Sequence, residues 1–324
     1  MSVQTTVIGS YPKPPPEGGT FTLRKTLHAL ERGEATADDL RTAHEALTRE
    51  VIEEQAGAGI DLVTDGSVRW DDIVTPFARH MSGFVVGGLL RFFDNNVYYR
   101  RPVCTGPVEW AGPATADAFK YAQSVAPVPV KAVIPGPVTF AHLAIDEYYN
   151  DHVKFVMALA GVLAQEAFEL EAAGATVIQI DEPALLGAPE DIDLARRAIN
   201  LVVGELNAAE TVVATYFGDA KRLGEEFFTL PVNVFGLDFI SGPENHELLK
   251  LAPQGTRVQA GVVDARNTML EPEDELAATI ESIAETVGLE NLWVAPSAGL
   301  EFLPREKARS KLVRLATAAK KVGA

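Results

Sequence analysis

The chain has 324 residues, of which 47% are hydrophobic, enough for one large globular domain or two small ones. Its 45 acidic residues outnumber its 28 basic residues, and the formal net charge of −17 argues against nucleic acid or an anionic membrane surface as a partner. Cys104 is the only cysteine, so one chain can form neither an intrachain disulfide nor a metal site with several thiolates.

The N-terminal sequence MSVQTTVIGS has no basic segment followed by an apolar run. No stretch approaches the roughly 18 uninterrupted apolar residues that a bilayer span needs. We therefore expect a cytoplasmic protein whose partner is a small molecule, and the sequence leaves its oligomeric state open.

Eight segments have the apolar, β-branched texture of buried strands, and most are followed by helical sequence. They are Thr5–Ser10, Ile60–Asp65, Val130–Pro135, Thr176–Asp181, Thr211–Tyr216, Asn233–Asp238, Arg257–Asp264 and Leu292–Pro296. Helices are predicted over Thr36–Gln55, Asp71–Met81, Tyr149–Ala173, Asp191–Ala208, Asp219–Phe228, Glu244–Leu251, Pro272–Val287 and Pro304–Val322. Thr36 and Asp38 are candidate caps for the first of these helices.

Eight strands alternating with helices over about 300 residues match the order and size of a (β/α)8 barrel. We therefore predict an α/β fold in which residues 1–324 form a single TIM-barrel domain. The alternative is a doubly wound open sheet, but no G-x-G-x-x-G motif follows the first strand. Between Phe84 and Trp110 short aromatic and β-branched runs alternate with turn residues. This pattern predicts a small antiparallel β-hairpin insertion, residues 83–111, after the second strand.

The most informative segment is Thr176–Pro183, TVIQIDEP, in which an apolar strand ends in the carboxylates Asp181 and Glu182. In parallel α/β folds the ligand lies at the carboxyl ends of the strands, so this pair is a candidate functional site. The alternative is that Asp181 caps a following turn while Glu182 faces solvent.

Other strand ends carry polar residues that a barrel would bring to the same face. They are Ser10, Asp65 with Ser67, Tyr216, Asp238, Asp264 with Arg266, and Ser297. Several carboxylates around one mouth repel each other unless a cation, a protonated carboxyl or an arginine such as Arg69, Arg101 or Arg266 offsets them. This crowding favours a functional site, although each aspartate alone is equally typical of a helix N-cap.

Six motifs in chain order resemble the catalytic barrel of cobalamin-independent methionine synthase, in the short form without the extra N-terminal barrel. They are TTVIGSYP at Thr5–Pro12, DGSVRWDDIV at Asp65–Val74, GPVT at Gly136–Thr139, QIDEPAL at Gln179–Leu185, GVVD at Gly261–Asp264 and WVAPSAGL at Trp293–Leu300. The resemblance implies a TIM barrel and a methyltransferase activity.

That family holds a catalytic zinc ion with a His, two Cys and a Glu, and the matching positions here are Ala214, Tyr216, Ala298 and Asp238. One carboxylate and one phenol cannot replace the four zinc ligands of the family. We therefore predict that this chain has no metal ligands and does not use zinc-thiolate chemistry. The family's catalytic histidine corresponds to Arg266, a glutamate that holds the substrate amine to Ser67, and a folate-stacking tryptophan to Leu143. The residues kept are the Ile8-Gly9-Ser10 turn, the amine-holding Asp181, and Arg101, which matches a folate-site arginine.

The first hypothesis is therefore a methionine-synthase-like methyltransferase acting on a small amino-acid or thiol-like substrate. Its predicted catalytic residues are Asp181, Tyr216, Asp238 and Arg266. Its predicted substrate-binding residues are Ile8, Gly9, Ser10, Ser67, Arg101, Glu182, Asp264 and Ser297. No cofactor is predicted, and the sequence does not identify the methyl donor.

Two alternatives remain because this barrel hosts many chemistries. One is a metal-free lyase, decarboxylase or hydrolase with Tyr216 or Asp238 as acid–base and Arg266 as oxyanion stabiliser. The other is a non-catalytic ligand-binding barrel.

Overall fold

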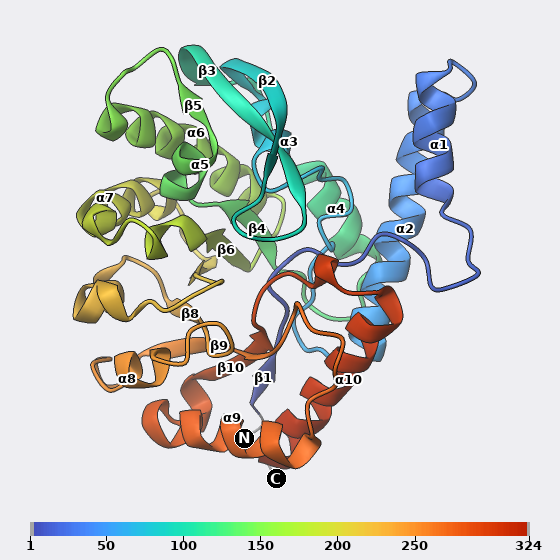
Figure 1. Cartoon of the computed structure of the whole chain (residues 1–324). Coiled ribbons are helices and arrows are strands. Elements are labelled where there is room, and N and C mark those ends of the chain that lie inside the picture. The colour runs from blue at the N-terminus through green and yellow to red at the C-terminus, as the bar shows by residue number, and fades with distance from the viewer. Residues whose placement is uncertain (1–2, 323–324) are drawn as a thin grey trace.

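The computed structural model describes residues 3–322 and contains a curved sheet of seven parallel strands, with helices packed along its outer side (Figure 1). The strand order is β1-β10-β9-β8-β7-β6-β4. These strands are β1 (Gln4–Thr5), β4 (Ala132–Pro135), β6 (Val177–Asp181), β7 (Glu210–Ala214), β8 (Val234–Asp238), β9 (Arg257–Val263) and β10 (Leu292–Pro296). All seven lie within or next to predicted strands, so the parallel α/β architecture is confirmed.

The predicted second strand, Ile60–Asp65, is not a strand of this sheet. Only Leu62 and Val63 pair with neighbours, through isolated parallel bridges to Thr6 and Val130. Pairing is short because the chain turns on both sides, at Gly59 (φ 91°) and Gly66 (φ 70°), where glycine tolerates a positive φ. The sheet is therefore a seven-stranded one, and closure into an eight-stranded barrel stays a prediction.

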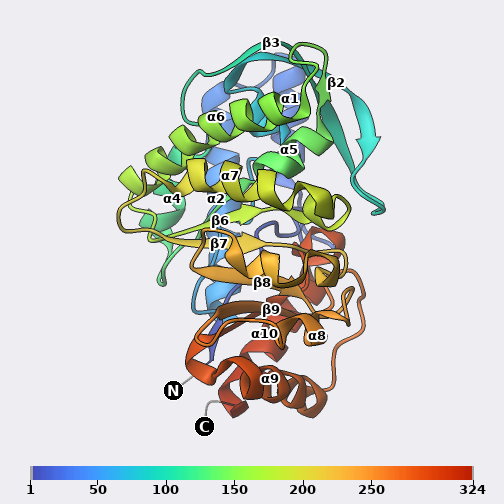
Figure 2. The same cartoon turned by 90° about the vertical axis from the view of Figure 1, so that its left-hand side faces the viewer.

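Helices follow most of the strands, and Figure 2 shows α5, α6 and α7 on the near side of the stacked strands and α2 and α10 on the far side. The α-helices are α1 (Thr22–Glu31), α2 (Ala37–Gly57), α3 (Thr75–Ala78), α4 (Ala116–Val125), α5 (Pro137–Leu143), α6 (His152–Ala172), α7 (Ile192–Val203), α8 (Asn245–Leu249), α9 (Glu273–Val287) and α10 (Arg305–Val322). Five short 3-10 helices are η1 (Pro183–Leu186), η2 (Pro189–Asp191), η3 (Lys221–Thr229), η4 (Leu289–Asn291) and η5 (Leu300–Phe302). Within residues 3–322, no helix is long and apolar enough to cross a bilayer.

Two predicted helices differ from the observed ones for local reasons. The helix predicted over Asp71–Met81 shrinks to α3, because Asp72 Oδ1 accepts the amides of Val74 and Thr75 and so fixes a turn just before it. The predicted helix Asp219–Phe228 is instead the 3-10 segment η3, interrupted at Gly224 (φ 59°). Thr36 caps α2 as predicted, in a reciprocal capping box with Asp39.

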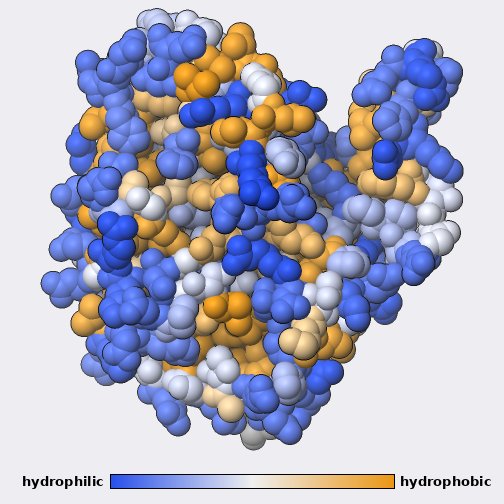
Figure 3. Space-filling model, viewed as in Figure 1, coloured by the Kyte–Doolittle hydropathy of each residue, from blue (hydrophilic) through white to orange (hydrophobic). Residues whose placement is uncertain are grey.

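An antiparallel hairpin is present where the insertion was predicted. It consists of β2 (Met81–Arg91) and β3 (Tyr98–Trp110), and the two-residue strand β5 (Ile145–Asp146) pairs with β3. The hairpin packs on the helical layer through Phe84, whose ring lies 5.6 Å from Phe140 and 6.2 Å from Phe155 between centroids. Figure 3 shows apolar side chains gathered on this hairpin, while the tip of α1 and α2 is mainly hydrophilic.

The core is split into two regions by the sheet. A small cluster of Leu62, Val177, Val212, Val234 and Trp293 fills the interior near the amino ends of the strands. The larger cluster lies mainly between the sheet and the helices. Burial of each such aliphatic side chain contributes about 1.5 to 3 kcal/mol, so the sheet is a rigid support for the loops at its carboxyl edge.

The carboxylate of Glu182, directly after β6, joins that strand to the start of α5. Its oxygens accept the amides of Val138 (2.9 Å) and Thr139 (2.7 Å) and the Thr139 hydroxyl (2.7 Å). A carboxylate at a helix N-terminus satisfies otherwise unpaired amides and complements the helix dipole. Gly136 leaves room for it, because a Cβ there would lie 2.0 Å from Glu182 Cδ.

We predict that Gly136→Ala lowers the free energy of unfolding by about 2 to 4 kcal/mol, since the added methyl displaces a buried, hydrogen-bonded carboxylate. Gly161→Ala is the matched control, because its Cβ in α6 would meet no atom within 4 Å. That change should be neutral or stabilising by up to about 1 kcal/mol. Urea unfolding of both variants provides the measurement, and equal stability of the two would contradict the assignment.

Candidate active site

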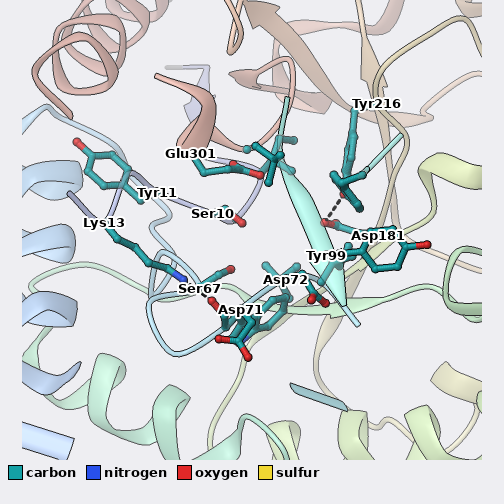
Figure 4. A pocket seen from close by; sticks show the side chains of 18 of the residues that line it. Ser10, Tyr11, Lys13, Ser67, Asp71, Asp72, Tyr99, Asp181, Tyr216 and Glu301 are labelled. Atoms are coloured by element: carbon teal, nitrogen blue, oxygen red, sulfur yellow. Dashed lines mark hydrogen bonds between the residues drawn. The ribbon is translucent and has the colours of Figure 1, made fainter. Parts of the chain in front are cut away.

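A cavity of about 240 Å³ opens at the carboxyl edge of the sheet (Figure 4). Its wall combines the loop after β1, the segment before α3, the β2–β3 turn, and the ends of β6, β7 and β10. The polar side chains in the wall are Ser10, Tyr11, Lys13, Ser67, Asp71, Asp72, Tyr98, Tyr99, Asp181, Tyr216 and Glu301. The cavity thus lies where ligands bind in parallel α/β folds.

Asp181, the last residue of β6, forms the polar floor of the cavity. Gln179 Nε2 donates to Asp181 Oδ1 at 2.7 Å, and the Tyr216 hydroxyl donates to Oδ2 at 3.0 Å. Burial raises the pKa of Asp181 to about 7, although both hydrogen bonds and the charge of Lys131 oppose this rise. The carboxyl group therefore has a fixed orientation and changes protonation near neutral pH.

A buried polar layer beneath the floor holds Gln179 in place. Lys131 Nζ donates to Gln179 Oε1 at 2.6 Å and to Gln259 Oε1 at 2.9 Å, which leaves the Gln179 amide nitrogen to face Asp181 and Ile8 O. Burial lowers the pKa of Lys131 to about 7. The lysine therefore determines which way the Gln179 amide points.

Two residues in the wall have strained backbones. Ser67 has φ 51° and Phe217 has φ 76°, a region that bulky side chains rarely adopt. Strain of this kind persists where the surrounding structure enforces it and is concentrated at functional sites. The strain at Phe217 turns the chain directly after Tyr216, which lies buried against Asp181. Burial and the neighbouring Asp181 raise the pKa of Tyr216 well above its usual value, so the phenol stays protonated.

The predicted substrate-binding turn Ile8-Gly9-Ser10 lines the cavity together with Ser67. Ile8 O accepts from Gln179, so the turn and Asp181 share one anchor. A Cβ on Gly9 would lie 3.6 Å from Val133, an ordinary contact. A side chain at position 9 would therefore fit without a clash. The turn contributes to the cavity through its backbone, because Ile8 O accepts from Gln179.

Four predicted site residues have structural roles away from the cavity wall. Glu182 caps α5, as described above. Both oxygens of Asp238 are occupied, because Oδ2 accepts the Phe217 amide (3.0 Å) and Oδ1 those of Ile240 (2.9 Å) and Ser241 (2.8 Å). Asp264 Oδ1 accepts the Arg266 amide (2.8 Å), and Ser297 Oγ accepts the Ala265 amide (3.2 Å). These strand-end side chains accept backbone amides. Glu182 is buried, so the alternative that it faces solvent is wrong.

The two predicted arginines also lie outside the wall. Arg266 donates to Ser241 Oγ (2.7 Å) and Asn95 Oδ1 (3.2 Å), and its guanidinium lies 5.2 Å from the Phe217 ring centre. The Phe217 ring lines the cavity and lies against this guanidinium, whereas Arg266 does not line the cavity. This placement corrects the predicted role of Arg266 as an oxyanion stabiliser. Arg101 donates to Ala144 O at 3.1 Å and likewise does not line the cavity.

The sequence analysis missed two charged residues of the wall, Glu301 and Lys13. Glu301 follows β10 and comes directly after the motif that contains Ala298, and burial raises its pKa to about 7. Lys13 lies in the loop after β1, and burial lowers its pKa. Both follow a strand end by several residues rather than directly. A search of whole strand-end loops, rather than of their first residues, would have found them.

The positions that match the family's zinc ligands do not fit a zinc site. Ala214 and Ala298 have no donor atom, Asp238 is saturated by backbone amides, and Tyr216 donates to Asp181. A catalytic zinc needs about three protein ligands, usually His, Cys or carboxylate. Among residues 3–322, no group of three or more His, Cys, Asp and Glu is arranged to hold a metal ion.

Comparison with known proteins identifies the family. The family model "Cobalamin-independent synthase, Catalytic domain" matches residues 3–321. The chain belongs to this family. It is 35% identical over 320 residues to a methionine synthase of Saccharolobus solfataricus, covering 98% of this chain and 94% of that protein. It is 32% identical over 313 residues to a methionine synthase of Sulfurisphaera tokodaii, covering 96% and 90%.

Solved structures support the same fold. A B12-independent methionine synthase from Shewanella sp. W3-18-1, in complex with selenomethionine, has a TM-score of 0.86 at 24% identity and covers 100% of this chain and 98% of its own. A methyltransferase from Methanosarcina mazei has a TM-score of 0.69 at 14% identity, covering 100% and 95%. At these identities the likeness concerns the fold.

We predict a specific pH dependence for Asp181→Asn. The pKa of Asp181 rises from 3.8 to about 7 on folding, so the folded chain keeps a proton that the unfolded chain releases. This stabilisation is present below pH 4 and is lost as the pH rises through 7. Asparagine removes it, so the stability of the variant relative to the parent should rise by on the order of 3 kcal/mol from pH 5 to pH 8. Urea unfolding at both pH values tests this, and parallel pH profiles would contradict it.

Proposed function

We propose that this protein is a methyltransferase-type enzyme that binds a small amino-acid or thiol-like substrate in the cavity above Asp181 and acts without zinc-thiolate chemistry. One observation carries the proposal: the Asp181 carboxylate is held by Gln179 and Tyr216 at the floor of the cavity, beside the Ile8–Ser10 turn. Family membership and relatives named methionine synthase support the reaction class.

In this proposal Asp181 anchors the substrate amine, and the backbone of Ile8, Gly9 and Ser10 faces the remaining polar end of the substrate. An ammonium–carboxylate hydrogen bond is about twice as strong as a neutral one, which suits a residue that must orient a small ligand. The Tyr216 hydroxyl donates to the Asp181 carboxylate and so holds it in a fixed orientation.

The finer description of the fold belongs to the same proposal. The bridges at Leu62 and Val63 connect the two edges of the seven-stranded sheet, next to β1 and next to β4. We take this segment as the eighth member of a closed (β/α)8 barrel spanning one domain. Such closure would direct all strand-end loops to one mouth.

The alternative of a metal-free lyase, decarboxylase or hydrolase has lost part of its support. It assigned the acid–base role to Tyr216 or Asp238 and the oxyanion role to Arg266, but Asp238 accepts backbone amides, Arg266 pairs with Ser241, and neither lines the cavity. A non-catalytic binding protein differs from the proposal only in turnover. Methyl transfer to a thiol in the presence of a methyl donor therefore separates that alternative from an enzyme.

We predict that L-methionine raises the melting temperature of the parent and that Asp181→Asn abolishes the rise, because an amide cannot offset the ammonium charge. Asp117→Asn on α4 is the control, since that side chain is 88% exposed and does not line the cavity. Its ligand-induced shift should equal that of the parent. Equal shifts in Asp181→Asn and the parent would remove Asp181 from the site.

A second prediction concerns zinc. Protein purified without chelators should contain far less than one zinc per chain and should not form methionine from homocysteine with methylfolate or methylcobalamin. The reason is the donor set of one saturated aspartate, one phenol and two alanines. Elemental analysis measures the metal content. Stoichiometric zinc, or methionine formed under these conditions, would overturn the assignment.

A further inference from the structure

Glu301 is the one wall carboxylate with a buried oxygen that lacks a hydrogen-bond partner within residues 3–322. That atom, Oε2, is buried, while the Glu301 residue is partly exposed and lines the cavity. An unpaired carboxylate oxygen in such a place costs free energy unless a ligand supplies the missing donor. Gly299 makes the position possible, because a Cβ there would lie 2.1 Å from Oε2.

The other carboxylates of the wall already have donors. Asp72 Oδ1 accepts two amides, and its Oδ2 accepts the Thr75 hydroxyl and the Arg100 amide (3.1 Å). Asp71 pairs with Arg79 at 2.6 Å. Each oxygen of Asp181 accepts one hydrogen bond. Glu301 Oε2 is therefore the buried carboxylate oxygen of the wall that still lacks a hydrogen-bond donor among the described residues.

The electrostatics of the cavity favour a cationic donor. Glu301 and Asp181 raise each other's energy when both are ionised, and the repulsion adds to burial in raising the pKa of Glu301. Lys13 lowers that pKa from a distance, but its ammonium donates to Trp70 O, and no ion pair joins it to Glu301 among the described residues. A positive group placed between the two carboxylates would relieve the repulsion.

Figure 4 shows how such a group would fit. Glu301 and Asp181 come from different strand ends and line the same cavity, with Ser10 just below Glu301 in this view. An ammonium group has three hydrogen-bond donors and can therefore reach more than one acceptor. A neutral ligand group could donate a hydrogen bond but would not offset the repulsion between the two carboxylates, and an anionic group would add to it.

We propose that Glu301 is a specificity-determining residue that binds the ammonium group of the substrate together with Asp181. This inference rests on the proposed function, because it assigns a second contact to the same ligand. It explains why the cavity would accept amino acids and reject their des-amino analogues.

The test is isothermal titration calorimetry with two probes, L-methionine and 4-(methylsulfanyl)butanoate, which lacks the amine. The parent should bind L-methionine at least tenfold more tightly than the des-amino probe. Glu301→Gln should weaken L-methionine binding at least tenfold, while any affinity for the des-amino probe is kept or increased. Gly299→Ala should weaken L-methionine as well, because it displaces Oε2 without removing the charge.

Glu285→Gln is the matched control, since Glu285 is exposed on α9, and it should bind both probes as the parent does. A loss of less than tenfold in Glu301→Gln, or an equal loss for both probes, would overturn the role of Glu301 while the proposed function stands. Failure of the parent to bind L-methionine would instead reject the proposed function, and this inference with it. Thermal unfolding of each variant confirms that it is folded.

Discussion

The hydrogen bond from Gln179 to Asp181 is the interaction on which the site depends. Lys131 and Gln259 both donate to the oxygen of the same amide, so the buried residues beneath the cavity floor fix the direction of the Gln179 donor. Buried polar groups of this kind are costly unless all are paired. The network therefore couples the stability of the sheet interior to the orientation of the proposed substrate anchor.

The remaining strand-end carboxylates show how acidic groups can crowd one edge without sharing one role. Glu182 stabilises the start of α5, and Asp238 holds the turn after β8 and the amide of Phe217. These contacts position Tyr216 and the strained residue that follows it. Glu182 and Asp238 thus fix backbone outside the cavity wall, while Asp181 and Glu301 line the cavity.

Much of this arrangement could be predicted from the sequence, because buried parallel strands and strand-end polar residues have clear patterns. Asp181, Tyr216 and the Ile8–Ser10 turn line one cavity, while their functional roles stay predictions. The pattern could not separate a carboxylate that caps amides from one that faces a ligand, which is why Asp238 and Glu182 were misassigned. Lys131 and Glu301 were missed, because one lies inside a strand pattern and the other within a short 3-10 turn.

The central claim is that this family member keeps the amine anchor but has replaced the metal site by a metal-free wall. A crystal structure of the protein grown with L-methionine and zinc tests it most directly. The account predicts the ligand nitrogen within hydrogen-bond distance of the Asp181 carboxylate and no zinc bound at Tyr216 or Asp238. A zinc ion coordinated by either residue, or a ligand bound away from Asp181, would contradict it.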